Sequence, residues 1–69
     1  MTEYLVIYEQ EGDSWGAYSP DLPGCVAAGA TRDEVEALMA EAVQLYVEYM
    51  RGVGMAVPVP SHAAGYVGD

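Results

Sequence analysis

The sequence predicts a two-layer α+β domain, in which one helix covers a three-stranded antiparallel sheet. Three short segments rich in β-branched, aromatic or small residues, separated by Gly and Pro turns, fill the first 29 positions. A long stretch with apolar residues at helical spacing follows, from about residue 32 to 51. With 69 residues, the chain has room for one domain, residues 1–69, which includes a Gly- and Pro-rich tail at 52–69.

The first predicted strand covers residues 3–10, "EYLVIYEQ". Strand alternation divides its apolar side chains between two faces, Leu5 and Ile7 on one and Tyr4, Val6 and Tyr8 on the other. Because both faces are apolar, we expect a central position in the sheet.

The second and third strands are predicted at residues 14–19 and 25–29, on either side of the loop "PDLPG". Gly12 can supply the positive φ of the first hairpin turn. Pro23 and Gly24 favour a type II turn. Leu22 lies between Pro20 and Pro23, both of which break regular structure. We therefore expect its side chain to point inward and fill the core as a plug.

The helix is predicted at residues 32–51. Thr31 and Glu34 form a capping-box pattern at its start, and Gly52 and Gly54 offer a stop. The pattern puts one apolar face on Val35, Leu38, Met39, Ala42, Leu45, Tyr46 and Tyr49.

A second apolar flank of the helix contains Val43, Val47 and Met50. One small sheet can hardly cover both this flank and the main face. We therefore predict self-association through the flank, as a homo-oligomer such as a dimer or tetramer. In the tail, residues 63–67 could supply a short fourth strand.

The charge is strongly acidic, with eleven Asp and Glu against two Arg and a net charge of −9. This balance argues against direct binding of nucleic acid or an anionic membrane, and it would steer a basic protein partner. Keeping a small protein soluble is the other reading of the same charge. Without a secretory signal or an apolar membrane span, a soluble cytoplasmic protein is expected.

Few residues suit catalysis or metal binding. The chain has no lysine for Schiff-base or phosphate-loop chemistry, and a lone Cys25 and a lone His62 cannot complete a zinc site. We expect Cys25 to be a buried small hydrophobe and His62 a solvated tail residue. Acids gather at the first hairpin, but turns collect them for solvation, so no metal site and no cofactor are predicted.

Asp21 in the loop and the nearby Trp15 and Tyr18 each have two possible roles, one within the fold and one at an interface. Asp21 is expected to accept backbone N–H groups within its own turn, in preference to contacting a partner. Trp15 and Tyr18 fit either the core or, if exposed, an interface anchor.

Four motifs follow one another along the chain: the aromatic-Gly hairpin, "SPDLPGC", the "G-x-T-x-x-E" helix entry and the "G…VPVPS" exit. In this order they resemble the N-terminal domain of HicB-type antitoxins, over about residues 3–61. The resemblance implies a partial ribonuclease H-like fold, β-β-β-α-β. It also implies a non-enzymatic protein that masks HicA, a small basic toxin that cleaves mRNA.

Under this hypothesis the contacts to the toxin are guessed from charge and aromatic content as Glu9, Glu11, Asp13, Trp15, Tyr18 and Asp21. The alternative is an orphan interaction or regulatory module with no toxin. Full-length HicB proteins usually continue into a DNA-binding segment, and the absence of a basic region here argues against DNA binding. A metal-dependent nuclease is not expected, because "YLVIY" in the first strand lacks the carboxylate that such an enzyme needs.

Overall fold

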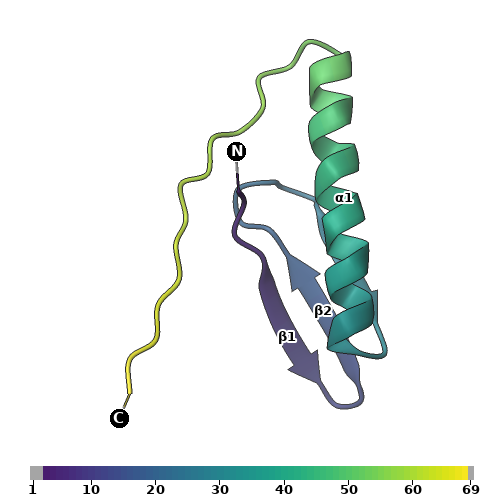
Figure 1. Ribbon diagram of the computed structural model, residues 1–69, viewed down its shortest axis with the longest axis vertical. Coiled ribbons are helices and arrows are strands. Elements are labelled where there is room, and N and C mark those ends of the chain that lie inside the picture. Colours follow the sequence, from purple (N-terminus) through teal and green to yellow (C-terminus); the bar gives the residue numbers. More distant parts are fainter. Residues whose placement is uncertain (1–2, 69) are drawn as a thin grey trace.

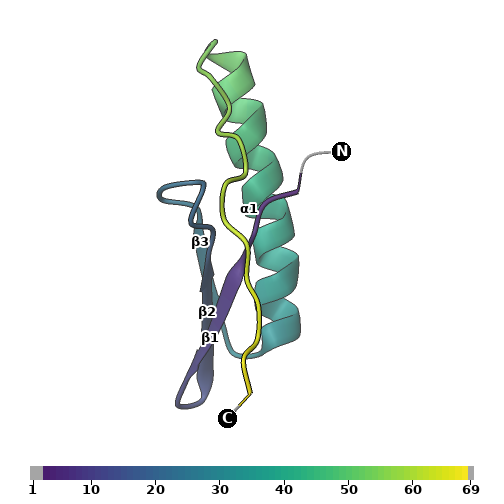
Figure 2. The ribbon, with the colours of Figure 1, turned by 90° about the vertical axis from the view of Figure 1, so that its left-hand side faces the viewer.

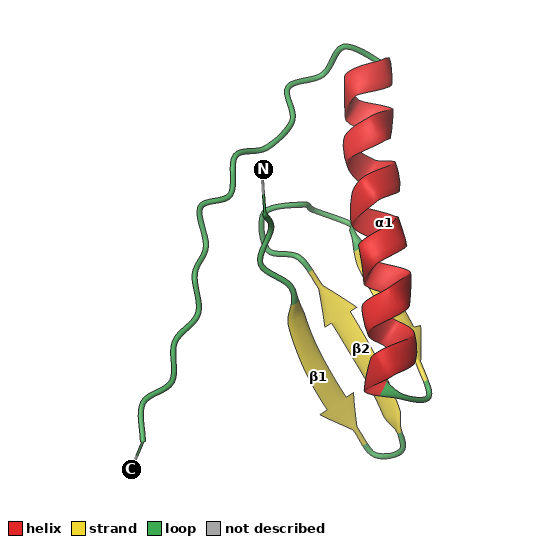
Figure 3. Cartoon of the chain, viewed as in Figure 1, coloured by secondary structure: helices red, strands yellow, loops and turns green. Residues whose placement is uncertain are grey.

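Three antiparallel strands and one helix make up the fold in the computed structural model, which describes residues 3–68 (Figures 1 and 3). The elements are β1 (Ile7–Glu11), β2 (Ser14–Tyr18), β3 (Val26–Gly29) and α1 (Arg32–Gly52). The sheet order is β1-β2-β3, and α1 lies across one face of the sheet. The predicted α+β arrangement is confirmed, but residues 63–67 form no strand, so a fourth strand is absent from the described part of the chain.

The two tight turns form where glycine permits them. Gly12 has a φ of 61° between the paired residues Glu11 and Ser14, which confirms the predicted positive φ and shows that the hairpin loop has two residues. Gly24 has a φ of 82°, and the Cys25 amide donates to the Leu22 carbonyl at 3.0 Å. These are the features of the type II turn predicted around Pro23 and Gly24.

Strand β1 lies at the edge of the sheet, so the prediction of a central strand is wrong. It also begins at Ile7 instead of residue 3. Residues 3–6 precede the ladder without joining it, because β2 ends at Tyr18, opposite Ile7, and the chain then turns away in the loop of residues 20–24. Their alternation is nevertheless as expected, since Tyr4, Val6 and Tyr8 all pack against the core.

The core lies between the sheet and the helix and consists of Ala17, Leu22, Cys25, Val35 and Met39. Leu22 is completely buried, which confirms that the loop residue acts as a plug. Cys25 is buried as predicted, and its burial raises the pKa of the thiol. A thiol that is both buried and protonated is a packing residue rather than a nucleophile.

The helix ends are formed by the residues that the sequence indicates. The Thr31 hydroxyl accepts a hydrogen bond from the Glu34 amide at 3.1 Å. At the other end Gly54 has a φ of 76°, and the Met55 amide donates to the Met50 carbonyl at 2.9 Å. Gly52 is the last helical residue, so the stop is made by Gly54 alone.

The helix buries a narrower face than predicted. Val35 and Met39 are buried, while Leu38, Leu45 and Tyr49 remain 41%, 56% and 66% exposed. Helix α1 packs mainly on β2 and β3, and its contact with the edge strand β1 is slight. Side chains at the margin of the predicted apolar face therefore extend past the sheet.

Removing the helix cap gives a moderate, local destabilisation. We expect Thr31→Ala to lower the free energy of unfolding by about 1 kcal/mol, because the Glu34 amide loses its acceptor. Urea denaturation followed by circular dichroism measures this change. Thr31→Ser keeps the hydroxyl and serves as the control, and equal losses in both variants would show that the hydroxyl is not the cause.

Candidate functional site

The face of the sheet turned away from the helix is open. Tyr8, Ala17 and Ala27 pack toward the core, so the residues that alternate with them point outward. The outward side chains surround a shallow hollow of about 450 Å³. Its lining includes Glu9, Glu11, Ser14, Gly16, Tyr18, Val26 and Ala28.

The hollow results from small residues in the middle of the sheet. Gly16 of β2 pairs with Ala28 of β3, and neither carries a side chain large enough to fill the surface. Larger groups surround them, with Glu9 and Glu11 on the edge strand β1 and Tyr18 at the end of the central strand β2. A partner's side chain can therefore rest on the small residues while its polar end reaches a carboxylate.

The carboxylates of this face have no cationic partner among the residues that the structure describes. Over residues 3–68, the ion pairs within 4.0 Å are Arg32 with Glu36 and His62 with Asp21. Glu9 and Glu11 are exposed and belong to neither pair. Their negative charge is free to interact with an incoming cation.

The structure brings together part of the predicted contact set. Glu9, Glu11 and Tyr18 share the open face, and Asp13 lies exposed in the adjoining hairpin turn. Trp15 borders the hollow, but it alternates to the helix side and packs against the core, so we leave it out of the group. We call Glu9, Glu11, Asp13 and Tyr18 the acidic face.

Asp21, the remaining predicted contact, is buried and binds the tail. Its carboxylate accepts hydrogen bonds from the Ser61 amide at 3.1 Å and the Ser61 hydroxyl at 2.7 Å, and lies 2.6 Å from His62 Nδ1. The expectation that Asp21 bonds within its own turn is therefore wrong. So is the expectation of a purely solvated His62, although half of that side chain is exposed.

These contacts hold the acid in its charged form. The pKa of Asp21 falls to about 2, chiefly because the Ser61 hydroxyl donates to the carboxylate, while burial acts in the opposite direction. We call Asp21, Ser61 and His62 the tail latch. No local sequence signal predicts it, because its partners are 40 and 41 residues apart.

The tail latch contains the residue types of a hydrolase triad without the geometry. In a triad the histidine bridges the serine and the acid with its two different ring nitrogens. Here Nδ1 of His62 faces Asp21, and the Ser61 hydroxyl donates to that same carboxylate and lies 3.4 Å from the same nitrogen. The hydroxyl is thus bonded to the acid and is not activated by the imidazole.

Metal ligands do not gather in the described part of the chain. Over residues 3–68, no three His, Cys, Asp or Glu side chains are placed to share an ion. Nor is any helix within these residues long and apolar enough to cross a membrane.

Comparison with protein families gives one match that covers nearly the whole chain. Residues 4–69 match the model of the HicB_like antitoxin of bacterial toxin-antitoxin systems. No curated protein and no solved structure gave a significant match. The match includes the acidic face, the loop with the Leu22 plug and the tail latch. The chain therefore belongs to the HicB-like antitoxin family of bacterial toxin–antitoxin systems.

Proposed function

We propose that this protein is an antitoxin that binds a small basic HicA-type toxin through the acidic face and blocks the toxin's RNA-binding surface. Membership of the family supports the role, and the net charge of −9 supports a basic partner. The observation that carries the choice of surface is the open sheet face, where Glu9 and Glu11 lack a cationic partner among residues 3–68.

The physical basis is complementarity with an RNA-cleaving enzyme. Such an enzyme needs Lys and Arg to bind phosphates, and those cations attract the carboxylates of an acidic inhibitor. The charge accelerates encounter, and Tyr18 beside the hollow supplies an aromatic contact. In this proposal the protein acts by occlusion in the cytoplasm, and the ribonuclease H-like arrangement implied by the family has no nuclease role.

Charge reversal tests the surface. We expect Glu9→Lys combined with Glu11→Lys to weaken toxin binding by about 100-fold, because two attractive contacts become repulsive. The probe is a purified small basic toxin of the HicA type, and calorimetry with stopped-flow kinetics measures affinity and association rate.

The control changes the same charge elsewhere. Glu3→Lys combined with Glu41→Lys alters two exposed acids outside the acidic face and should reduce only the association rate, by a few fold. Equal losses of affinity in both double variants would reject the acidic face as the binding surface. If no toxin of this type from the same bacterium binds the unaltered chain, the orphan interaction module is the better description.

A further inference from the structure

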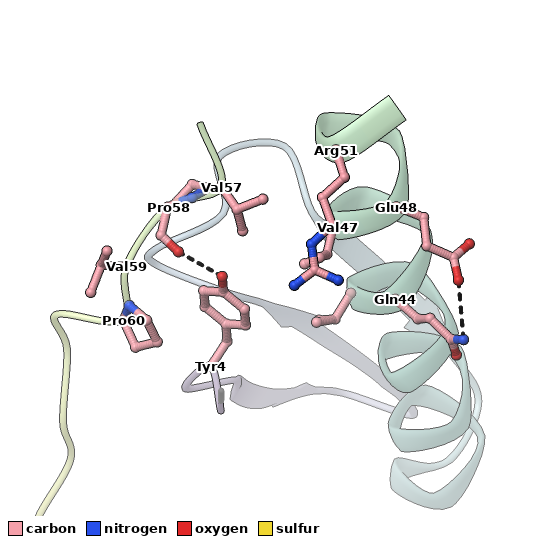
Figure 4. Close-up of a pocket in the computed structure, with 10 residues that line it drawn as sticks. Tyr4, Gln44, Val47, Glu48, Arg51, Val57, Pro58, Val59 and Pro60 are labelled. Atoms are coloured by element: carbon pink, nitrogen blue, oxygen red, sulfur yellow. Dashed lines mark hydrogen bonds between the residues drawn. The ribbon is translucent and has the colours of Figure 1, made fainter. Parts of the chain in front are cut away.

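A second hollow lies on the other side of the molecule, between the last turns of α1 and the tail. Its volume is about 710 Å³. Figure 4 shows that the helix forms one wall, the tail the opposite wall, and Tyr4 stands between them. We call it the tail groove, lined by Tyr4, Val43, Gln44, Val47, Glu48, Arg51, Val57, Pro58, Val59 and Pro60.

The tail is joined to the body at two places. The Tyr4 hydroxyl donates to the Pro58 carbonyl at 2.6 Å, and the tail latch holds residues 61 and 62. No backbone hydrogen bond joins the tail residues 56–61 to residues 3–6 across the groove, within the described part of the chain. Figures 1 and 2 show the tail running back past the sheet as an extended segment.

The residues that follow the tail latch include apolar side chains that are exposed to solvent. Tyr66 and Val67 are fully exposed, and residues 63–68 have no regular structure. One chain thus offers both an apolar groove and an apolar segment that does not fill it. Backbone groups of residues 3–6 lie outside any ladder, so an extended segment entering the groove can pair with them. The tail wall offers packing more than pairing, because Pro58 and Pro60 lack N–H groups and the Ser61 amide already donates to Asp21.

The chain exposes more surface than a compact monomer of its mass, and the excess is close to the area that each partner buries in a stable dimer. The chain exposes 5183 Å². A compact monomer of 7.4 kDa exposes about 4200 Å², so the excess is about 1000 Å². A standard protein–protein interface buries about 800 Å² on each partner. The radius of gyration agrees, at 13.2 Å against about 11 Å for a compact chain of this length.

We propose that the tail groove receives residues 63–67 of a second copy, and that the exchange is reciprocal, so that two copies form a closed dimer. Tyr66 and Val67 of the incoming segment contact Val43 and Val47 of the groove. With a two-fold axis, each copy's segment fills the other copy's groove, so no groove is left for a third copy. Two of the three residues predicted for self-association, Val43 and Val47, line this groove, while Met50 does not.

The charges of the two copies permit this arrangement. Glu9, Glu11 and Asp13 lie on the sheet face and hairpin, outside the groove lining. The carboxylate in the lining is that of Glu48, which accepts a hydrogen bond from the Gln44 side-chain amide at 3.3 Å (Figure 4). The groove holds one of the two arginines. Arg51 extends into it opposite Tyr4 and has no carboxylate within 4.0 Å among residues 3–68 (Figure 4).

Sedimentation equilibrium of the full chain tests the dimer. We expect a mass of twice 7.4 kDa at micromolar concentration. Val47→Glu in the groove and Tyr66→Glu in the segment should each give a monomer. Because Tyr66 is fully exposed, its replacement cannot disturb the core, so a monomer there does not result from unfolding.

Leu45→Glu is the matched control, since this exposed leucine lies on the helix outside the groove lining. It should leave the dimer intact. An unaltered chain that remains monomeric up to millimolar concentration would overturn the proposal, as would a dimer lost with Leu45→Glu and kept with Tyr66→Glu.

Cross-linking identifies the occupant. A Val47→Cys chain mixed with a tagged Tyr66→Cys chain should form a disulfide-linked heterodimer on mild oxidation, while buried Cys25 stays unreactive. Homodimeric cross-links without the heterodimer would reject residues 63–67 as the occupant. These experiments need no toxin, so their outcome is independent of the acidic-face proposal.

Discussion

Leu22→Ala should lower the free energy of unfolding by about 3 kcal/mol, the largest loss expected from a single substitution in this chain. The Leu22 side chain is completely buried and belongs to the core cluster, which includes residues of both the sheet and the helix. Two tight-turn bonds fix its backbone, because the Leu22 amide donates to Ser19 and its carbonyl accepts from Cys25. The loop therefore cannot collapse to fill the cavity.

A loss of this size is a large fraction of the total stability of a small domain, which is roughly 5 kcal/mol at the lower end of the usual range. Urea denaturation followed by tryptophan fluorescence of Trp15 measures it. Leu45→Ala removes the same atoms from an exposed site and should cost less than about 0.5 kcal/mol. If the two variants lose similar stability, Leu22 is not the plug of the core.

Asp21→Asn should release the tail while leaving the sheet and helix folded. The amide is nearly the same size as the carboxylate but is neutral and offers one acceptor oxygen in place of two. The bonds from Ser61 and His62 are charge-assisted, and this assistance is lost. We expect hydrogen exchange at the Ser61 amide to accelerate by at least about tenfold. Glu9→Gln removes an exposed charge elsewhere and should leave that rate unchanged.

Acid should release the tail in the same way. The pKa of Asp21 in the folded protein is about 2, below its ordinary value of 3.8. A depressed pKa means that the carboxylate stabilises the folded state at pH values above about 4, and that this contribution disappears as the pH falls through about 2. Exchange at Ser61 should therefore accelerate only in strong acid.

Carbon-13 NMR of the Asp21 carboxyl group measures the pKa directly. Ser61→Ala should raise it more than His62→Ala does, because the serine hydroxyl is the largest cause of the shift. Titration of the unaltered carboxyl group near 3.8 would contradict the tail latch.

The sequence alone determined the local elements of this protein. Gly12 and Gly24 permit turns that few other residues allow, Thr31 supplies the cap, and Leu22 lies between two breakers. Each of these effects acts within about four residues, so the local sequence is sufficient to predict the turns and the helix cap. Alternation along β1 also places Glu9 and Glu11 on the same face without knowledge of the fold.

The tertiary structure decided which of these elements meet. The edge position of β1, the exposure of Leu38, Leu45 and Tyr49, and the bonds between Asp21 and residues 61–62 all depend on where distant segments lie. Such contacts depend on packing between elements, and side-chain spacing along one element carries no record of its neighbours. For this reason the acid in the "PDLPG" loop was predicted to serve its own turn, whereas the folded chain uses it to hold the tail.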